Sequence, residues 1–391
     1  MAEQPENPPI VFIDDAHTLG GTQIALAWTI QVVLTKTEIP VLCVCTVRTR
    51  RAVEAVTGVN SRLQFEEAPS ALPLNLFCFP IRLPAYWFIL RRLRNRGVRA
   101  WWLNLADIEF GLAPLLVLRA MGETTHSYIH GTGQFSLFYQ AASRKRRLLS
   151  YVRDAISNKF VFRLHSCLVA ASRSSQKELE SRITSRKRPS IGYLYYPPIG
   201  IFASQLRRPV ARDQTLPLQL WMIGNVIQGH KNNLLLLDLL EHLAQIGHTP
   251  TLGVAGVGPD LQTFQREADR RGLAERITYF GWVADPCAMV PKQAIIVIPS
   301  FHETMNLVAR EAMRYGLGLV VSPIPVFHEW IPPALIAADF SPAAFATRIC
   351  ELNRRSGDEL AEMYRRALNQ FSDDIFLKDL LRISSISQAS L

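Results

Sequence analysis

The sequence predicts an α/β protein built from two parallel-sheet units in tandem. Its 391 residues correspond to two domains at about 100–200 residues per domain. In both halves, short apolar runs alternate with segments of helix length, a pattern typical of parallel strands covered by helices on both faces. A polar stretch without periodicity, LRRPVARDQTLP (206–217), separates the two series. We therefore expect an N-terminal domain over residues 1–208, a C-terminal domain over residues 209–391 and a linker where they join.

The first half contains a series of candidate strands. The apolar runs are residues 10–16, 41–47, 74–81, 100–107, 125–131 and 167–172, and a further strand is expected after a basic turn within 185–202. The run GGTQIALAWTIQVVLTK (20–36) predicts the first of the intervening helices.

The second half repeats this alternation. Its candidate strands are residues 218–225, 249–258, 277–283, 293–300 and 318–324. The last 45 or so residues have a helical pattern, and we expect the last helix, about 371–391, to pack back on the N-terminal domain. Ligands of parallel α/β sheets bind beyond the carboxyl ends of the strands. Two facing Rossmann-like units would therefore hold a ligand in a central cleft.

The net charge of +10 lies entirely in the first half, where residues 1–200 carry 25 Lys and Arg against 14 Asp and Glu. Such an excess suits an anionic partner, either lipid or nucleic acid. The basic residues concentrate in 87–102 and 143–164, beside Trp, Tyr and Phe, as on the surface of an anionic membrane. No nucleic-acid-binding motif accompanies them, so we expect no nucleic acid partner. A solvated helix face remains the alternative to membrane contact.

Several sequence features bear on the compartment. The apolar runs are shorter than the roughly 18–20 residues of a membrane span, and the polar start MAEQPENPP does not read as a signal peptide. The six cysteines have neither zinc nor disulfide spacing. We expect a cytoplasmic protein, with peripheral attachment at the inner face of a membrane as an open alternative.

Two strand ends of the first half carry residues suited to ligand contact. Gly20 and Gly21 stand between a strand and a helix, where glycine lets a ligand approach the backbone and the helix start offers N–H donors. His130 ends another strand before a Gly-rich turn, a place from which it could bind a sugar or phosphate or transfer a proton. A plain turn and a satisfied edge histidine are the structural alternatives.

Two loops of the second half also end strands. In IGNVIQGHKNN (223–233), Lys231 lies near a helix start, where it could neutralise a diphosphate; a solvated surface lysine is the alternative. In GVAGVGPDLQTF (253–264) we interpret Gly256 and Gly258 first as a structural turn and second as a close approach to a ligand.

The segment PSFHETMNLVAREAM (299–313) holds two acids. Glu303 is expected in the loop before a helix that starts near Asn306, and Glu311 more than one turn inside that helix. At a rise of 1.5 Å per residue the two lie on the order of 10 Å apart, too far for paired acid–base work across one bond. The spacing suits two ends of one elongated ligand whose phosphate meets the helix N-terminus.

In this order and at these spacings, the motifs resemble the retaining glycosyltransferases of family four, which have the GT-B fold. The resemblance runs along nearly the whole chain and is strongest from about Leu218 to Trp330. In the first half it rests on the Gly-Gly loop, on His130 and on the segments AASRSS and YYPP. In the second half it rests on GNVIQGHK, GVGP, YFGWV and PSFHETMNLVAREAMRYG, the last with an E-x(7)-E signature.

The resemblance implies a retaining, metal-independent hexosyltransferase with no cofactor beyond a nucleotide-sugar co-substrate, such as a UDP- or GDP-sugar. The implied catalytic residues are His130 on the sugar, Lys231 on the departing diphosphate and Glu303 on the transferred sugar. The implied donor-binding residues are Gly20, Gly21, Asn225, Thr304, Met305, Asn306, Leu307, Val308 and Glu311. The acceptor would be a glycan or a lipid-linked hydroxyl, as in glycolipid, lipopolysaccharide or exopolysaccharide synthesis.

Two positions depart from the family pattern. Asn225 stands where the family has an arginine, which removes a cation from the diphosphate site. Asn306 replaces a glycine at the helix start, although asparagine tolerates unusual backbone angles. The first departure leaves open a catalytically weak nucleotide-sugar-binding protein, and the fold leaves open a nucleotide-sugar epimerase.

Overall fold

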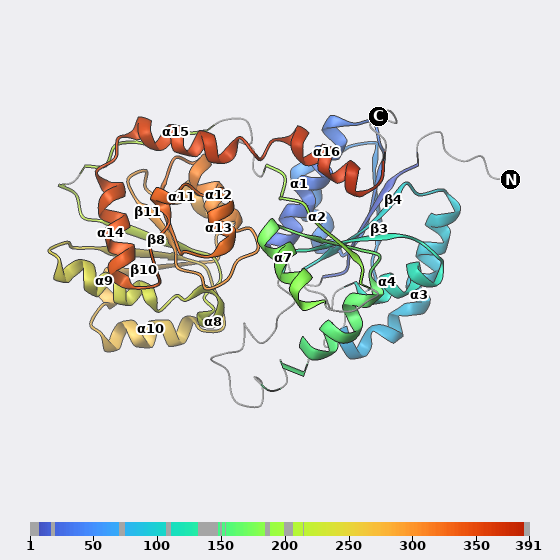
Figure 1. Ribbon diagram of the computed structural model, residues 1–391, viewed down its shortest axis with the longest axis horizontal. Helices are drawn as coiled ribbons and strands as arrows, with labels where there is room; N and C mark the ends of the chain where they lie inside the picture. Colours follow the sequence, from blue (N-terminus) through green and yellow to red (C-terminus); the bar gives the residue numbers. More distant parts are fainter. Residues whose placement is uncertain are drawn as a thin grey trace. The chain divides into compact units, whose positions relative to one another are not determined.

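The computed structural model describes residues 8–16, 20–69, 75–106, 111–131, 148, 151–152, 154–183, 188–198, 206–213 and 215–386. These residues divide into two compact units (Figure 1). Unit 1 holds the described residues up to 198 together with 371–386, and unit 2 holds those from 206 to 370. Each unit is described by itself.

Unit 1 is built on a parallel sheet of seven strands in the order β3-β2-β1-β4-β5-β6-β7. The strands are β1 (Ile10–Asp14), β2 (Val41–Cys45), β3 (Leu63–Glu67), β4 (Ala100–Leu105), β5 (Thr125–Ile129), β6 (Cys167–Ala170) and β7 (Ser190–Tyr193). The helices are α1 (Gly21–Lys36), α2 (Val47–Thr57), α3 (Asn75–Asn95), α4 (Leu112–Ala120), α7 (Arg173–Arg182) and α16 (Asp373–Ile383), with a π-helical turn η1 (Ser157–Val161) and a 3-10 turn η2 (Phe162–Leu164).

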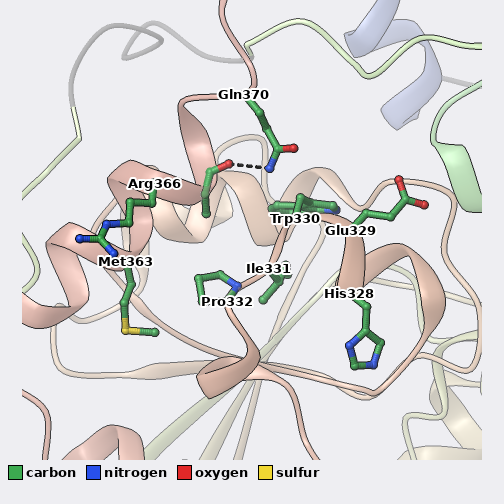
Figure 2. Close-up of a pocket in the computed structure, with 9 residues that line it drawn as sticks. His328, Glu329, Trp330, Ile331, Pro332, Met363, Arg366 and Gln370 are labelled. Carbon is green, nitrogen blue, oxygen red and sulfur yellow. Dashed lines mark hydrogen bonds between the residues drawn. The ribbon is translucent and has the colours of Figure 1, made fainter.

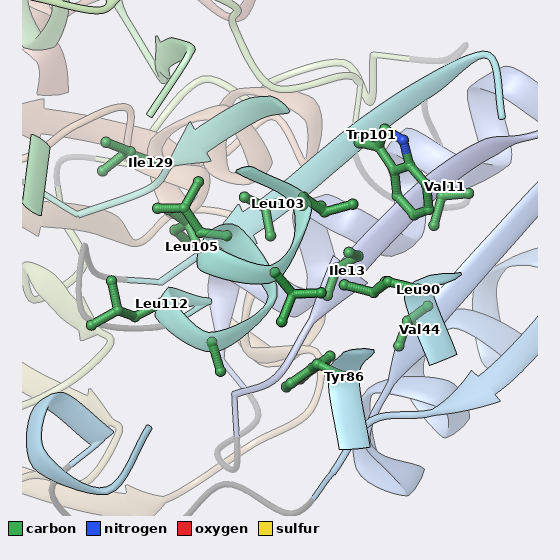
Figure 3. Packing of buried hydrophobic residues seen from close by; sticks show 14 of the residues in the cluster. Val11, Ile13, Val44, Tyr86, Leu90, Trp101, Leu103, Leu105, Leu112 and Ile129 are labelled. Atoms are coloured by element: carbon green, nitrogen blue, oxygen red, sulfur yellow. The ribbon is translucent and has the colours of Figure 1, made fainter. Parts of the chain in front are cut away.

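One face of this sheet packs on α3 and α4. Val11 and Ile13 of β1 join Leu90 of α3 and Leu112 of α4 in one cluster of buried side chains (Figure 3). Alternate side chains of a strand point to opposite faces of the sheet. The residue between Val11 and Ile13 must therefore also be apolar if helices are to cover the other face.

The other face packs on helices from both ends of the chain. Phe12 lies between Val11 and Ile13, and its ring contacts Trp102 of β4. The Trp102 indole N–H donates to Ser384 Oγ, 3.0 Å away, just after α16. α16 also packs on α1. The last described helix therefore belongs to unit 1, although unit 2 precedes it in the chain.

One predicted strand of unit 1 is wrong. Residues 75–81 of the apolar run begin α3, and the edge strand is instead LQFEE of β3. Strand β3 pairs only with β2 and is half exposed, so it needs little apolar character and gives a weak signal. Beyond the apolar run, the buried positions Arg82, Tyr86, Leu90 and Leu93 follow helical spacing.

Unit 2 is built on a parallel sheet of five strands in the order β10-β9-β8-β11-β12, all of which coincide with predicted strands. The strands are β8 (Gln219–Ile223), β9 (Thr251–Ala255), β10 (Ile277–Gly281), β11 (Ile295–Ile298) and β12 (Gly318–Val321). The helices are α8 (Gln228–Lys231), α9 (Leu235–Gln245), α10 (Leu261–Arg270), α11 (Pro286–Met289), α12 (Leu307–Arg314), α13 (Pro325–Trp330), α14 (Pro342–Asn353) and α15 (Gly357–Leu368), with 3-10 turns η3 (Ala274–Arg276) and η4 (Pro333–Leu335).

Both sheets reverse their strand order at one point. The reversal lies between β1 and β4 in unit 1 and between β8 and β11 in unit 2. Loops at the carboxyl ends of such neighbouring strands diverge to opposite faces of the sheet and leave room for a ligand. The predicted fold class, two Rossmann-like parallel sheets covered by helices, is confirmed.

Residues 206–213 of the predicted linker are bound to unit 2. The Arg207 N–H donates to the Arg314 carbonyl at 2.8 Å, and the buried Arg212 side chain donates to the Gln293 carbonyl at 3.0 Å. The chain here passes over Gly316, Gly318 and Gly357, where a Cβ would meet the segment. This segment, which we call the strap, is an integral part of unit 2.

Candidate functional site

Two loops meet at the reversal point of unit 2. The first follows β8 and ends in α8, and the second follows β11 and leads into α12. The Phe301 N–H donates to the His230 carbonyl at 2.9 Å, and Lys231 Nζ lies 2.6 Å from Glu303 Oε1. The structure thus brings together Lys231 and Glu303, which are 72 positions apart in the chain.

Glu303 is a buried carboxylate with two donors on one oxygen. Its side chain is 7% exposed, and Oε1 accepts from Ser300 Oγ at 2.7 Å as well as from Lys231. Burial alone would raise the pKa of Glu303, but the positive Lys231 and the hydrogen bonds outweigh burial and hold the pKa at about 2. Glu303 is therefore ionised at neutral pH and can accept hydrogen bonds but not donate a proton.

His230 supplies the backbone of this site rather than a charge. Burial, reinforced by the positive charge of Lys231, lowers the pKa of His230 to about 3. Its imidazole is therefore neutral at pH 7, so Lys231 is the cation of this loop pair. The His230 ring lies 6.0 Å from that of His302, between ring centroids.

The N-terminus of α12 points into the same loop pair. Asn306 caps the helix by accepting from the Ala309 N–H at 2.8 Å, and its φ of 65° lies in the left-handed region that asparagine tolerates better than most residues. Leu307 and Val308 follow as the first helical residues, whose N–H groups have no acceptor within a helix. Such N–H groups and the helix dipole favour an anion.

The glycines after β9 have a structural explanation. A Cβ on Gly256 would overlap the carbonyl oxygen of Gly224, and one on Gly258 would overlap that of Val226. The Val226 N–H donates to the Val257 carbonyl at 3.0 Å, so the two loops are joined through their backbones. Gly256 and Gly258 thus shape the β8 loop that carries Lys231.

Glu311 lies on α12, away from the Lys231–Glu303 pair. Burial, with the negative charge of Asp285 nearby, raises the pKa of Glu311 to about 7. Its Oε2 is 4.0 Å from Cys287 Sγ of α11. The two acids of one segment therefore have opposite protonation behaviour, because Glu303 has a cation beside it and Glu311 an acid.

The remaining predicted donor residues of unit 2 differ in exposure. Asn225 is exposed at the end of β8, at the position that in the resembling family is an arginine. Thr304 is half-buried and Met305 is fully buried in the core. The Met305 side chain therefore anchors the loop in the core. Because this side chain is buried, only the backbone of Met305 could contact a ligand.

In unit 1, His130 lies in a buried hydrogen-bond network at the reversal point. Its Nε2 is 2.7 Å from Asn104 Oδ1 and its Nδ1 is 2.9 Å from Tyr196 Oη. The Asn104 amide donates in turn to Asp14, the last residue of β1. Burial lowers the pKa of His130 to about 3, so this histidine is neutral.

Gly20 caps α1 and Gly21 is the first residue of that helix. The Gly20 N–H donates to Gln23 Oε1 at 3.0 Å, so this donor is already engaged within the helix start. The helix N-terminus offers the next N–H groups, from Gly21 onward. The Gly20 backbone is extended, and a Cβ there would lie 3.8 Å from Gln23 Oε1. The fold therefore does not require glycine at position 20.

Some polar residues of these sites were not singled out from the sequence. Asp14, Asn104 and Tyr196 hold His130, and Ser300 holds Glu303. The sequence did contain two signals for these residues. Asn104 is a polar residue inside the apolar run AWWLNL, and Asp14 and Asp15 are two acids at the end of a buried strand. Polar groups that are buried in this way need hydrogen-bond partners.

A pocket of about 390 Å³ opens elsewhere in unit 2, between α13 and α15 (Figure 2). Its lining includes His328, Glu329 and Trp330 on one side and Met363 and Arg366 on the other. None of the predicted site residues is among the nine described residues that line it.

Comparison with known proteins bears on the site of unit 2. Residues 217–355 match the family described as glycosyl transferases group 1. This range spans both loops that carry Lys231 and Glu303.

Two curated proteins are similar to parts of this chain. A lipopolysaccharide 1,6-galactosyltransferase of Salmonella typhimurium is 23% identical over 150 residues, which cover 36% of this chain and 42% of the relative. EpsF of Bacillus subtilis, which carries a glycosyltransferase name, is 29% identical over 117 residues, 29% of each chain. The matched parts therefore span less than half the length of either relative.

Solved structures similar to the whole chain are GT-B glycosyltransferases. Anabaena HepE, solved with UDP and glucose, has a TM-score of 0.68 at 13% identity, over 97% of this chain and 100% of HepE. The lipopolysaccharide outer core galactosyltransferase WaaB has a TM-score of 0.59 at 16% identity, over 96% and 98%. Sucrose-phosphate synthase of Thermosynechococcus elongatus has a TM-score of 0.65 at 17% identity, over the same shares. At sequence identities of 13%, 16% and 17%, these similarities are evidence for the fold alone.

Proposed function

We propose that the protein is a glycosyltransferase that moves a hexose from a nucleotide-sugar, such as a UDP- or GDP-sugar, to an acceptor hydroxyl with retention of configuration. The observation that carries the proposal is the Lys231–Glu303 pair at the strand-order reversal of unit 2, beside the N-terminus of α12. The match of residues 217–355 to group 1 glycosyltransferases supports it, as does the structure of HepE in complex with UDP and glucose.

In this proposal each group has one task. Lys231 and the first N–H groups of α12 bind the diphosphate and stabilise its charge as it leaves, a task that needs no metal ion. The ionised Glu303 accepts hydrogen bonds from sugar hydroxyls, in keeping with its low pKa of about 2. Glu311 accepts hydrogen bonds from the ribose hydroxyls.

We propose a glycan or lipid-linked acceptor, as in glycolipid, lipopolysaccharide or exopolysaccharide synthesis, at the cytoplasmic face of a membrane. The support is the exposed face of α3 in unit 1. Ile81 is 72% exposed and Phe88 is 74% exposed, and Arg91 and Arg92 follow on the same face of the helix. Apolar side chains beside cations suit an anionic bilayer surface. Of the second basic segment, 143–164, residues 143–147, 149–150 and 153 lie outside the described part of the chain. None of the described helices is long and apolar enough to cross a bilayer.

A thermal-shift panel of nucleoside diphosphates and their sugars tests the donor. A ligand that binds the native state raises the melting temperature by an amount that grows with the logarithm of its concentration relative to Kd. We expect one base to stand out, in the wild type and in Glu275→Gln, an exposed control acid of unit 2. No shift with any nucleotide would contradict the proposal.

Transfer itself is tested with the donor that the panel identifies. Release of nucleoside diphosphate should require a membrane-derived acceptor and should be lost in Glu303→Gln. Donor conversion without any acceptor would instead indicate an epimerase. Binding without conversion would indicate the weak binder that the exposed Asn225 leaves open.

A further inference from the structure

Two adjacent carboxylates end β1 of unit 1, and both are buried. Asp14 is 0% exposed and Asp15 is 1% exposed. Asp15 pairs with Arg82 of α3 at 2.8 Å and accepts from the Gly111 N–H at 2.9 Å. These contacts tie the strand to the two helices beneath it, so Asp15 has a structural explanation. Asp14 points elsewhere.

Asp14 connects two groups that the site needs. Its Oδ2 accepts from Gln23 Nε2 at 3.1 Å, and Gln23 Oε1 accepts from the Gly20 N–H that begins α1. The same Oδ2 accepts from the amide of Asn104 on β4, whose Oδ1 faces His130 Nε2. One carboxylate oxygen thus joins the start of α1 to the end of β5 across the strand-order reversal.

The chain of hydrogen bonds fixes the form of the histidine. Burial raises the pKa of Asp14 to about 6, so Asp14 is ionised above neutral pH. An ionised Asp14 only accepts hydrogen bonds, so Asn104 must turn its NH₂ group toward Asp14 and its carbonyl oxygen toward His130. His130 Nε2 must therefore carry the ring hydrogen. Its Nδ1 is then an acceptor for the Tyr196 hydroxyl, 2.9 Å away.

We propose that Asp14 is a positioning residue, which holds the first turn of α1 through Gln23 and locks His130 in the Nε2–H tautomer through Asn104. Both ring nitrogens of His130 are then engaged within unit 1, so the ring serves as a fixed surface and not as an acid or base. The consequence for kinetics rests on the proposed function. Binding of the acceptor, which unit 1 would bind, should depend on this network, and binding of the nucleoside diphosphate, which unit 2 would bind, should not.

Nitrogen NMR of ¹⁵N-histidine-labelled full-length protein tests the tautomer without any substrate. Asp14→Asn removes a pure acceptor, and Asp15→Asn is the matched control because it alters an equally buried neighbour with other partners. We expect one Nε2–H tautomer for His130 at pH 8, where Asp14 is ionised, in the wild type and Asp15→Asn, and a mixture in Asp14→Asn. An Nδ1–H tautomer in the wild type, or the same His130 signal in both variants, would overturn the proposal.

Tyr196→Phe covers the case in which Asp14→Asn does not fold. It removes only the hydroxyl at Nδ1, so the Nε2–H tautomer should persist. A switch of tautomer in this variant would show that Tyr196, and not Asp14, sets the ring.

Steady-state kinetics complete the test. In Asp14→Asn we expect the KM for the acceptor to rise about tenfold, the loss expected from one hydrogen bond, while the Kd for nucleoside diphosphate, which unit 2 would bind, stays nearly unchanged. An unchanged acceptor KM despite a changed tautomer would overturn the positioning role. A wild type that transfers no sugar would contradict the proposed function alone, because the NMR result is independent of turnover.

Discussion

At the scale of single residues, the Lys231–Glu303 pair makes two different contributions. It stabilises the fold of the loop pair, because Glu303 is buried and ionised. It also keeps a cation at the mouth of the site, since Lys231 is 23% exposed on its side chain. The two contributions can be separated by mutation.

Lys231→Met should weaken the binding of nucleoside diphosphate by roughly 10–100-fold, the range for the loss of one charge-assisted hydrogen bond. It should also lower stability by about 1–3 kcal/mol, less than for a fully buried pair because Lys231 is partly solvated. Calorimetric titration and chemical denaturation measure the two effects.

Lys292→Met, at an exposed lysine of the same unit, is the control and should change neither quantity. The double variant Lys231→Met/Glu303→Gln should recover stability but not affinity. An affinity for nucleoside diphosphate equal to that of the wild type would refute the assignment of Lys231.

Glu311 predicts how donor binding depends on pH. Its pKa of about 7 means that the empty site is half protonated at neutral pH, whereas ribose hydroxyls need the carboxylate. The affinity for a nucleotide-sugar, whose phosphates do not titrate in this range, should therefore rise about tenfold from pH 6 to pH 8. Binding at pH 7 should release about half a proton per site, which titration in buffers of different ionisation enthalpy detects. In Glu311→Gln the pH dependence should disappear, and a wild type without it would contradict the role.

The raised pKa of Glu311 affects the stability of the ligand-free protein in the opposite direction to donor affinity. Because the folded pKa of Glu311 exceeds the ordinary value of 4.5, the native state binds the extra proton between pH 4.5 and 7. The stability from this group is complete below pH 4.5 and is lost as the pH rises through 7. Glu303 behaves conversely, and its contribution is lost as the pH falls from 4.5 through about 2.

The sequence placed Lys231 and Glu303 after two separate strands of unit 2, but it did not predict that their side chains pair. Lys231 and Glu303 each follow a strand, and the strand order brings β8 and β11 side by side. The sequence could not predict that Gln23 would occupy the Gly20 N–H or that Asn104 and Tyr196 would occupy both nitrogens of His130. Those contacts depend on side-chain placement across different elements, which no local pattern records.

At the scale of loops and helices, two glycines that look alike in the sequence differ in what the fold demands. Gly20→Ala should keep stability within about 1 kcal/mol of the wild type, because its backbone is extended and a Cβ has room. Gly256→Ala should cost more than about 2 kcal/mol, because the Cβ would overlap the Gly224 carbonyl oxygen. Thermal denaturation of the two variants makes the comparison.

If Gly20 exists for close approach of a ligand, Gly20→Ala should reduce transfer while the protein remains folded. Equal activity of Gly20→Ala and the wild type would remove Gly20 from the site.

Helix α3 carries the membrane prediction. Phe88→Ser and the pair Arg91→Glu/Arg92→Glu should each reduce co-sedimentation with vesicles that contain anionic lipid, the first through lost apolar contact and the second through lost electrostatic attraction. Arg266→Glu, at a cation of α10 in unit 2, is the charge control. Equal sedimentation with neutral and anionic vesicles would refute the electrostatic part.

Prediction of strands succeeded for every strand of unit 2, including the half-exposed edge strand β10, and for the inner strands of unit 1. It failed at the edge of unit 1, where β3 is half exposed and the apolar start of α3 imitates a strand. An edge strand such as β3 has fewer neighbours to bury its side chains, so its sequence can be polar and gives little strand signal.

At the scale of the whole molecule, the strap over residues 206–213 decides where unit 2 begins. Arg212→Met should destabilise unit 2 by about 2–4 kcal/mol, because the Gln293 carbonyl loses its buried donor. Hydrogen exchange should localise the loss to the strands β11 and β12, with β1 and β4 of unit 1 unchanged. Equal exchange throughout unit 2 in the variant and the wild type would contradict this role.

The strap also bears on how this chain can be recombined with proteins of the same fold. A hybrid made by exchanging unit 2 at residue 217, where the family match begins, would lay a foreign segment over the bare backbone at Gly316, Gly318 and Gly357. Those three glycines and the passing chain are shaped to one another. An exchange point before Arg207 would keep the strap together with these glycines. The unit that can be exchanged is therefore longer than residues 217–355, the range that matches the family.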